Sequence, residues 1–385
     1  MGDMGSTFTG LSGKNKEDFG HGNAQFITYM NVFSNPVANL EMTEAVEIDT
    51  KQNSVKKGDV FFTTSSETPE EVGMSCVMPE NKENIYLNSF CFGYRPTEKF
   101  DLNYLAYVLR ADSFRKEMIF LAQGISRYNI SKNKVMEIAI PVPNIEEQAM
   151  VGKYFTNLDH LITLHQRECE QAKKYKKYML QKMFPQNGSN VPEIRFSGFT
   201  HPWEQRKLSD LGEIMTGSTP STSKEEYYSV DGIPWVTPTD INTQIISDTP
   251  RKLSEEGAKV GRVVPANTIL CTCIASIGKN ALLTVEGSFN QQINSLTPYT
   301  ENNAYFLLTE SEIWSDKMKK MAASGTMQIV NKTEFSELIT MVPKTDEQKK
   351  IGDYFRTLDH LITLHQQKCE ELQKIKKFML QNMFV

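Results

Sequence analysis

The sequence lacks the motifs that would indicate catalysis or nucleotide binding. It contains no GxxxxGK[ST] P-loop and no GxGxxG turn, so nothing points to ATP-driven work or to a nucleotide cofactor site. The one candidate for an Asn-Pro-Pro-Tyr methyltransferase motif begins at Asn35 and lacks the aromatic residue that would stack on a flipped base. The histidines form no ligand cluster in the sequence. We therefore predict that the chain is not an enzyme and binds no metal.

Membrane and export signals are lacking as well. There is no apolar run of about 18 residues, and the N-terminus has neither a basic region nor an apolar core. The six cysteines form no CxxC pair, which favours reduced structural cysteines in a cytoplasmic protein. A net charge of −5 argues against gripping nucleic acid by bulk charge, although it leaves room for local basic loops.

What the sequence does contain is one segment that occurs twice. Residues 158–166 read LDHLITLHQ, and residues 358–366 repeat these letters at an offset of 200 residues. The repeat continues to MLQKMF at 179–184 and MLQNMF at 379–384. Because 200 residues is too long for a solenoid unit, we interpret the chain as a duplicated half-protein.

Both copies of the segment have the heptad spacing of a coiled coil. Mostly apolar residues recur at every seventh position from Val151 and Phe155, and again from Ile351 and Phe355. A helix of about 35 residues would be roughly 50 Å long and would bury its apolar stripe against the second copy. The residues predicted to pair the helices are Leu158, Ile162, His165, Leu358, Ile362 and His365. The two histidines are interpreted as polar residues that fix the register, because they do not supply the converging ligands that a metal needs.

These helices divide the chain into five predicted segments. Residues 1–143 and 203–343 are globular domains, residues 144–185 and 344–385 are the helices, and residues 186–202 are a linker. Both domains alternate short β-branched and aromatic runs with turns and one helical stretch. The predicted fold class is α+β, with two similar globular domains separated by two long antiparallel coiled-coil helices in a pseudo-two-fold internal repeat.

Local patterns predict the elements inside the domains. Strands are predicted at residues 25–33, 59–65, 85–94, 135–143, 233–241 and 268–285. Helices are predicted at residues 101–121 and 302–322. Trp235 is predicted to belong to the core.

Several motifs resemble the specificity subunit of type I restriction–modification enzymes, of the kind found in Gram-positive bacteria. They are the LDHLITLHQ helices, the MLQKMFP ending, VPEIRFSGFTHPWEQRKLSDLGEI at 191–214, GSTPSTSKEEYY, IPWVTPTDI and NQQIN. GKNKEDFGHGNAQFITYMNVF is similar to another subtype of the same target-recognition domain. The resemblance covers essentially the whole chain.

The resemblance implies a DNA-binding subunit without catalysis of its own, within a type I site-specific deoxyribonuclease and adenine-specific DNA methyltransferase complex. Each domain would read one half of a bipartite target. The helices would set the half-site spacing and dock two methyltransferase subunits and, through them, restriction (nuclease–translocase) subunits. S-adenosylmethionine, ATP and Mg would belong to those partners, and this chain would bind no cofactor.

The resemblance also implies that a segment like residues 191–210 should precede the first domain. Met1-Gly2-Asp3 aligns best near Leu211-Gly212-Glu213. The first domain is therefore expected to lack an opening segment of about twenty residues.

Polar and basic loop side chains are the candidates for DNA contact, because hydroxyl, amide and cationic groups read base edges and hold phosphates. In the first domain the candidates are Lys14, Lys16, His21, Thr28, Tyr29, Asn31, Arg127, Tyr128 and Asn129. In the second domain they are Ser218, Thr219, Thr237, Thr239, Ser276, Lys279, Asn290, Gln291, Gln292, Thr326 and Gln328. Residues 290–292 have a structural alternative, in which they hydrogen-bond a loop to the scaffold. The whole chain has an alternative too: a non-catalytic coiled-coil adaptor that pairs protein partners without reading DNA.

Overall fold

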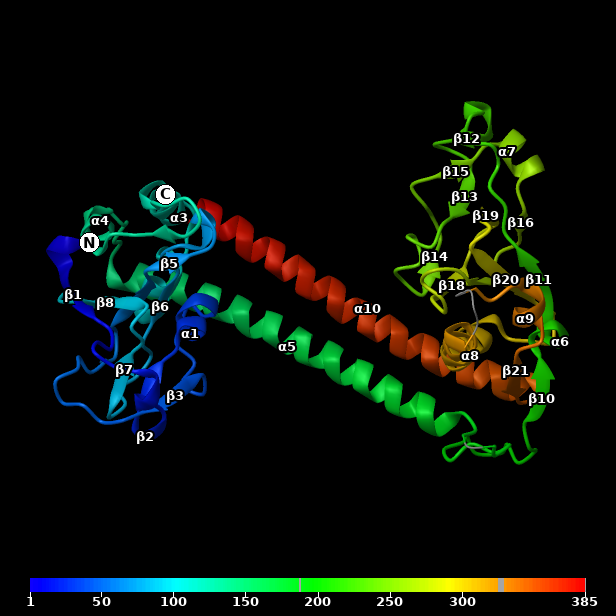
Figure 1. Ribbon diagram of the computed structural model, residues 1–385, viewed down its shortest axis with the longest axis horizontal. Coiled ribbons are helices and arrows are strands. Elements are labelled where there is room, and N and C mark those ends of the chain that lie inside the picture. The colour runs from blue at the N-terminus through cyan, green and yellow to red at the C-terminus, as the bar shows by residue number, and fades with distance from the viewer. Residues whose placement is uncertain (187, 325–328, 385) are drawn as a thin grey trace. The chain divides into compact units, whose positions relative to one another are not determined.

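The computed structural model describes residues 1–186, 188–324 and 329–384, and the chain divides into two compact units (Figure 1). Unit 1 comprises Met1–Arg167 and Gln366–Val385, and unit 2 comprises Glu168–His365. The long helices α5 (Ile145–Met183) and α10 (Thr345–Asn382) each contribute one part to each unit. The predicted fold class, α+β with two similar domains and two long helices, is confirmed. No helix in the described part of the chain is long and apolar enough to cross a membrane.

Unit 1 is built on two main sheets. The first has the strand order β1–β8–β4–β6, and the second has the order β3–β2–β7. The strands are β1 Gly5–Thr9, β2 Phe19–Ile27, β3 Thr43–Val46, β4 Val60–Thr63, β5 Ser65–Ser66, β6 Ser75–Val77, β7 Ile85–Leu87, β8 Cys91–Pro96 and β9 Tyr128–Asn129. The helices are α1 Tyr29–Ser34, α2 Leu102–Val108, α3 Asp112–Leu121 and α4 Lys132–Glu137, with 3-10 turns η1 Gly2–Met4, η2 Lys16–Asp18 and η3 Pro69–Glu71.

Several predictions for unit 1 are wrong in their extent or type. The strand predicted over 85–94 is two strands, β7 and β8, and the one predicted over 59–65 is β4 followed by the start of β5. The strand predicted over 25–33 ends at Ile27, because the Thr28 hydroxyl accepts a hydrogen bond from the Asn31 backbone N–H and starts α1. The helix predicted over 101–121 is two helices, α2 and α3. The strand predicted over 135–143 begins inside α4 and continues as chain without strand structure.

Unit 2 carries two five-stranded sheets, β11–β20–β17–β18–β14 and β12–β15–β13–β19–β16, and the pair β10–β21. The strands are β10 Glu204–Lys207, β11 Gly212–Thr216, β12 Tyr228–Ser229, β13 Ile233–Val236, β14 Ile245–Ile246, β15 Lys252–Leu253, β16 Val263–Val264, β17 Thr268–Thr272, β18 Asn280–Leu283, β19 Gly287–Phe289, β20 Ile293–Pro298 and β21 Ile339–Val342. The helices are α6 Leu208–Leu211, α7 Glu255–Val260, α8 Ala304–Ser324 and α9 Lys332–Ser336, with the turn η4 Glu225–Tyr227. Within unit 2, the sheet that contains β12 lies at the opposite end from α8 (Figure 1).

Two strand predictions for unit 2 are wrong in extent. The strand predicted over 233–241 ends at Val236, and the one predicted over 268–285 is the hairpin of β17 and β18. Trp235 is buried in β13, as predicted.

The first strands of the two sheets correct the alignment of the two halves. β1 pairs with β8 so that Gly5 faces Pro96, and β11 pairs with β20 so that Gly212 faces Pro298. Gly5 is therefore the counterpart of Gly212. The alignment of Met1-Gly2-Asp3 with this region is wrong by a few residues, because matching letters at a chain end carry less information than strand register.

The two long helices run antiparallel within each unit. In unit 1, Phe155 of α5 stacks on Phe384, which follows α10, at a ring distance of 5.5 Å. In unit 2, Phe355 of α10 lies 5.9 Å from Phe184, which follows α5. The repeat at an offset of 200 residues thus generates the same contact twice with the helices exchanged.

The residues predicted to pair the helices lie along these seams. Leu158 and Ile162 are buried in the same apolar cluster as Leu372, and Leu358 is buried in the cluster of unit 2. Ile362 is buried and its backbone oxygen lies 3.9 Å from Cys169 Sγ. His165 is half-buried, and His365 Nδ1 lies 3.1 Å from Glu168 Oε2.

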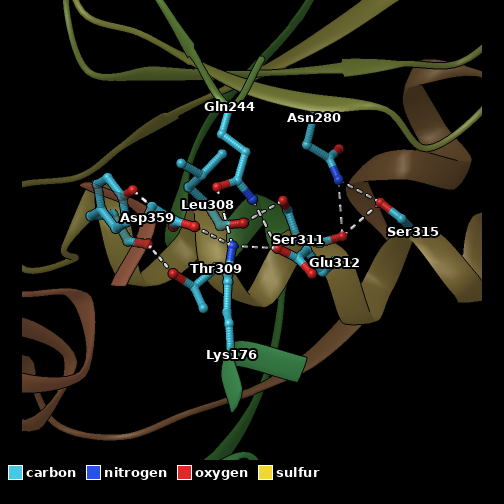
Figure 2. A network of polar contacts seen from close by, with 10 residues as sticks. Lys176, Gln244, Asn280, Leu308, Thr309, Ser311, Glu312, Ser315 and Asp359 are labelled. Carbon is cyan, nitrogen blue, oxygen red and sulfur yellow. Dashed lines mark hydrogen bonds and ion pairs between the residues drawn. The ribbon is translucent and has the colours of Figure 1, made fainter. Parts of the chain in front are cut away.

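An ion pair joins the two helices at the same place in each unit. In unit 1, Lys376 Nζ lies 2.5 Å from Asp159 Oδ1, and Tyr107 Oη donates to the other carboxylate oxygen at 2.7 Å. In unit 2, Lys176 Nζ lies 2.8 Å from Asp359 Oδ1 (Figure 2). Tyr305 Oη donates to Asp359 Oδ2 at 3.0 Å. Burial and the adjacent carboxylate raise the pKa of both tyrosines, so both stay protonated donors.

Unit 2 extends this ion pair from the long helices to its globular domain. Lys176 Nζ also contacts Glu312 Oε1 of α8 at 3.0 Å and Gln244 Oε1, just before β14, at 3.1 Å (Figure 2). Gln244 Nε2 donates to Glu312 Oε1 at 2.8 Å. Lys176 therefore connects α5, α10, α8 and the edge of the sheet through one cation.

Glu310 of α8 is expected to make the free energy of unfolding depend on pH. Its Oε1 accepts from the backbone N–H of Met341 at 3.2 Å and from the Thr340 hydroxyl, while Oε2 is buried without a hydrogen-bond partner in the described residues. Burial raises the pKa of this carboxyl to about 8. Between the unfolded and folded pKa values only the folded state holds the proton, so the free energy of unfolding falls as pH rises.

We expect Glu310→Gln to remove that slope. Relative to the unchanged chain, the variant should gain about 1.4 kcal/mol of stability for each pH unit between roughly 5 and 8. Urea unfolding of both proteins across this range measures the difference. A difference that stays constant with pH would show that Glu310 is ionised in the folded protein.

Candidate nucleic-acid interface

In unit 2, two parallel strands end side by side and their loops leave from the same edge. Val236, the last residue of β13, pairs with Phe289, the last residue of β19. The next residue, Asn290, donates its backbone N–H to Val236 O at 2.9 Å. Its buried side chain accepts the backbone N–H of Gln292 at 3.0 Å, so Asn290 fixes the turn that presents Gln291 and Gln292. Asn290 Nδ2 also donates to Gln292 Oε1 at 3.2 Å, so the structural role predicted as an alternative for residues 290–292 fits Asn290 and involves the Gln292 amide oxygen.

A second loop packs directly against this turn. At Gly217, an added Cβ would lie 2.2 Å from Asn290 O, so only glycine allows the two backbones to approach this closely. Ser218 is half-buried and follows this contact. The hydroxyl of Thr219 donates to Gln291 Oε1, and both residues are exposed. The hydrogen bond orients the Gln291 amide toward solvent at the strand ends.

The loop after β13 lies beside them. The hydroxyl of Thr237 donates to Asp240 Oδ2 at 2.6 Å and lies 2.8 Å from the hydroxyl of Thr239. Thr237 is half-buried and Thr239 is exposed. The Thr237 hydroxyl thus stabilises the loop, and Thr239 is the residue of this pair that can contact a ligand.

A third loop, residues 273–279, joins the same edge. Cys273 N donates to Gln292 O at 2.8 Å. Ser276 is half-buried, Lys279 is exposed, and a hollow of 430 Å³ beside them is also lined by Lys319. The loop therefore contributes one cation, Lys279, and Lys319 of α8 lines the same hollow. Thr326 and Gln328 lie outside the described residues.

Unit 1 repeats this hydrogen-bond arrangement. Ile27 at the end of β2 pairs with Leu87 at the end of the parallel strand β7, and Asn88 N donates to Ile27 O at 3.1 Å. Phe90 N donates to Asn88 Oδ1 at 2.9 Å. Thr64 N donates to Phe90 O at 3.0 Å, as Cys273 N does to its counterpart in unit 2.

We call this arrangement the strand-end frame. It comprises Ile27, Thr64 and residues 87–90 in unit 1, and Val236, Cys273 and residues 289–292 in unit 2. Even the glycine contact recurs, because a Cβ at Gly10 would lie 1.9 Å from Asn88 O. The counterparts are therefore Asn88 and Asn290, Ser89 and Gln291, and Phe90 and Gln292.

Sequence reasoning missed residues 88–90. The signal that could have found them is an Asn directly after the last residue of a short buried strand, which occurs at Leu87-Asn88 and again at Phe289-Asn290. The overall likeness of the two domains is too weak for a residue-by-residue match.

Several predicted residues of unit 1 lie beside its frame. Tyr29 Oη donates to Ser65 O at 2.8 Å, and Ser65 pairs with Asn129 in the short sheet of β5 and β9. Burial raises the pKa of Tyr29, which keeps it a protonated donor. Arg127 and Asn129 are exposed, while Thr28, Tyr29 and Tyr128 are half-buried.

Three predicted residues lie at the other end of β2. Lys14 Nζ pairs with Asp49 Oδ2 at 3.0 Å, and His21 Nδ1 lies 3.1 Å from Glu47 Oε1. Lys16 is exposed in η2, directly before β2. A strand rises about 3.3 Å per residue, so the length of β2 separates these side chains from the frame.

Asn31 is placed in the interior. Its side chain is fully buried, and Nδ2 donates to the carbonyl oxygens of Asn39 at 2.7 Å and Met42 at 2.9 Å. Asn31 was predicted to contact DNA because of its amide side chain, but that amide hydrogen-bonds to the segment after α1. Asn31 therefore supports the loop and presents no group to a ligand.

Comparisons with known proteins agree with the duplicated architecture. The family described as "Type I restriction modification DNA specificity domain" matches residues 1–174 and again residues 200–374. A solved structure of the S subunit of a type I restriction-modification system from M. genitalium has the same fold, with a TM-score of 0.65 at 14% identity, and the match covers 100% of this chain and 94% of that one.

Two curated relatives are similar over shorter regions. The HindI specificity subunit of Haemophilus influenzae is 33% identical over 171 residues, which is 42% of this chain and 37% of the relative. The MjaIX specificity subunit of Methanocaldococcus jannaschii is 30% identical over 190 residues, which is 48% of this chain and 44% of the relative. In these alignments the chain spans less than half the length of both relatives.

Proposed function

Because the chain belongs to the family of type I restriction modification DNA specificity domains, we propose that it is the sequence-specificity subunit of a type I restriction–modification complex. Each unit reads one half of a bipartite DNA target from the loops around its strand-end frame. The observation that carries this proposal is the frame itself: two equivalent sets of hydrogen bonds, from backbone N–H groups to backbone oxygens and to one Asn side chain, present different side chains. A scaffold that is kept while its exposed residues differ suits two readers of different sequences.

The partners and cofactors of the proposed complex follow from the same role. The chain binds double-stranded DNA and supplies no catalytic step. Two methyltransferase subunits dock on the long helices, and restriction subunits join through them. S-adenosylmethionine, ATP and Mg are used by those subunits, and the complex works in the cytoplasm. The adaptor alternative is not favoured, because the family match covers both domains.

Gln291 and Lys279 test the reading by unit 2. Gln291→Ala should weaken binding to the correct second half-site about tenfold and relax base discrimination there, because an oriented amide pairs with a base edge. Lys279→Ala should weaken binding to all sequences and reduce its salt dependence, because a lysine neutralises phosphate charge. Binding is measured with the full chain and its methyltransferase subunit on duplexes changed in one half-site at a time.

The control variant is Gln205→Ala, which removes an exposed glutamine from β10 of the same unit. It should leave both half-sites unaffected. Equal loss at both half-sites in the Gln291 variant would contradict the assignment of this edge to the second half-site.

A further inference from the structure

The two strand-end frames match in their backbone and differ in the chemistry that they expose. Phe90 of unit 1 occupies the position of Gln292 in unit 2, and 56% of the Phe90 side chain is exposed. Met30 and Thr239 are also counterparts, since each is the third residue after the strand that ends the frame, and Met30 is 54% exposed. At both positions unit 1 offers an apolar group where unit 2 offers a polar one.

A further exposed apolar residue of unit 1 lies on a segment that is joined to its frame. Ile125 is 98% exposed in the loop that leads to β9. β9 pairs with β5 at Ser65, the residue after Thr64, so this loop runs beside the segment that Phe90 contacts. Exposed apolar side chains with polar groups around them indicate a binding surface, because burying them against a ligand removes apolar area from water and is favourable.

The rim also carries groups that suit DNA. Arg127 is exposed two residues after Ile125, and Thr28 and Asn129 flank the same segments. Such a surface suits DNA: the apolar side chains can contact a methyl group on a base edge, and the hydrogen-bonding groups can contact the base. The cation can contact the neighbouring phosphate. In the major groove only thymine carries such a methyl, whereas adenine offers the donor and acceptor that pair with a glutamine amide.

We propose that unit 1 reads thymine methyl groups through Phe90 and Met30, whereas unit 2 reads adenine edges through the amides of Gln291 and Gln292. The proposal rests on the proposed function and adds the class of base contact at each half-site. Phe90 is a specificity-determining residue in this scheme, and Asn88 positions it by accepting its backbone N–H.

Replacing thymine with uracil tests the proposal, because uracil lacks only the methyl group. The full chain with its methyltransferase subunit is bound to duplexes in which single thymines of one half-site are exchanged for uracil. At one or two positions of the first half-site, each exchange should weaken binding about threefold to fivefold, as expected for one buried methyl group. Exchanges in the second half-site should leave binding by Gln291 and Gln292 unchanged.

Phe90→Gln should abolish the dependence on the methyl group while leaving discrimination at the second half-site intact. Phe120→Ala is the matched control, because it removes an exposed aromatic residue of α3 outside the frame, and it should keep the dependence. A Phe90 variant that unfolds early in a thermal scan is replaced by Met30→Thr, for which the same loss at the first half-site is expected.

Sequence-specific binding without any effect of uracil in the first half-site would overturn this inference and leave the proposed function standing. Binding with no sequence preference at all would overturn the proposed function and this inference with it. Loss of methyltransferase binding in the Phe90 variant, with the methyl dependence unchanged, would assign the apolar surface to a protein partner and would also overturn the inference.

Discussion

Replacing Lys176 with Met is expected to lower the free energy of unfolding of unit 2 by about 2 to 4 kcal/mol. The Lys176 side chain is only 10% exposed and contacts two carboxylates, Asp359 at 2.8 Å and Glu312 at 3.0 Å. Removing the cation leaves two negative charges close together with reduced access to water. We place the effect below the largest values for buried pairs because Glu312 is partly exposed.

The Lys176 substitution should also weaken DNA recognition by unit 2. Gln244 bonds to Lys176 and Glu312 directly before β14, and its backbone oxygen accepts the N–H of Leu282 in β18. Without Lys176, the sheet edge next to the loop of Thr239 keeps its hydrogen bond to Glu312 of α8 but loses its connection to α5 and α10. We therefore expect weaker discrimination at the second half-site and unchanged discrimination at the first.

Lys177→Met is the control for this experiment, because it removes a neighbouring lysine that is exposed on the same helix. Its effect on chemical unfolding should be within about 0.5 kcal/mol. An equally small effect of Lys176→Met would mean that the ion pairs of Figure 2 contribute nothing to the attachment of the recognition domain.

Gly352→Ala is expected to destabilise unit 2 by about 3 kcal/mol, the upper part of the range for overpacking. An added Cβ would lie 2.4 Å from Asn303 Oδ1 and 3.0 Å from Phe306 N, where α8 begins against α10. Asn303 cannot swing away, because Oδ1 accepts the Phe306 N–H and its backbone N–H donates to Gln348 Oε1. Its melting temperature should fall by roughly 6 to 12 °C, given the size of the unit.

The other half of the chain supplies a replicate of this experiment. A Cβ added at Gly152 would lie 2.6 Å from Asp101 Oδ1 and 2.7 Å from Tyr104 N, so Gly152→Ala should destabilise unit 1 in the same way. Lys349→Ala, an exposed substitution on α10, is the control. Melting at the unchanged temperature in both glycine variants would show that the helices do not press on α2 and α8 this closely.

The parts of the fold that the sequence predicted are those with a local signal. Each long helix has its heptad pattern within one continuous segment, and the repeat at an offset of 200 residues indicates the duplication. The strand-end frame has no local signal of this kind, because it joins segments that are far apart in the sequence: Asn88 bonds to Ile27, 61 residues away, and Asn290 bonds to Val236. Pattern alone could not place such contacts.

Residue type was a poor guide to the role of single polar residues. Asn31 and Asn290 both carry the amide expected of a base reader, yet both side chains are buried and hold loops in place. Phe90 was left out because it is apolar, and its exposure follows only from the turn that Asn88 fixes. Burial and turn geometry, which depend on distant segments, separate these roles.

The same limit applies to the contacts that hold the helices. Asp159 and Asp359 are exact repeats in the sequence, but the tyrosines that bond to them, Tyr107 and Tyr305, are not at matching positions. Each domain reaches the repeated carboxylate from a different turn of its own helix. The repeat predicts the carboxylate, and only the packing of α2 and α8 supplies its partner.

The central claim is that two units on one scaffold read two different half-sites. Methylome sequencing of a naive host that carries this chain with its cognate methyltransferase subunit tests it most directly. We predict adenine methylation in a bipartite motif whose two halves differ in sequence and are separated by unspecified bases. A motif confined to one half-site, or two identical halves, would contradict the claim that both units read DNA. No motif at all, with the chain folded and bound to its partner, would contradict the DNA-reading function itself.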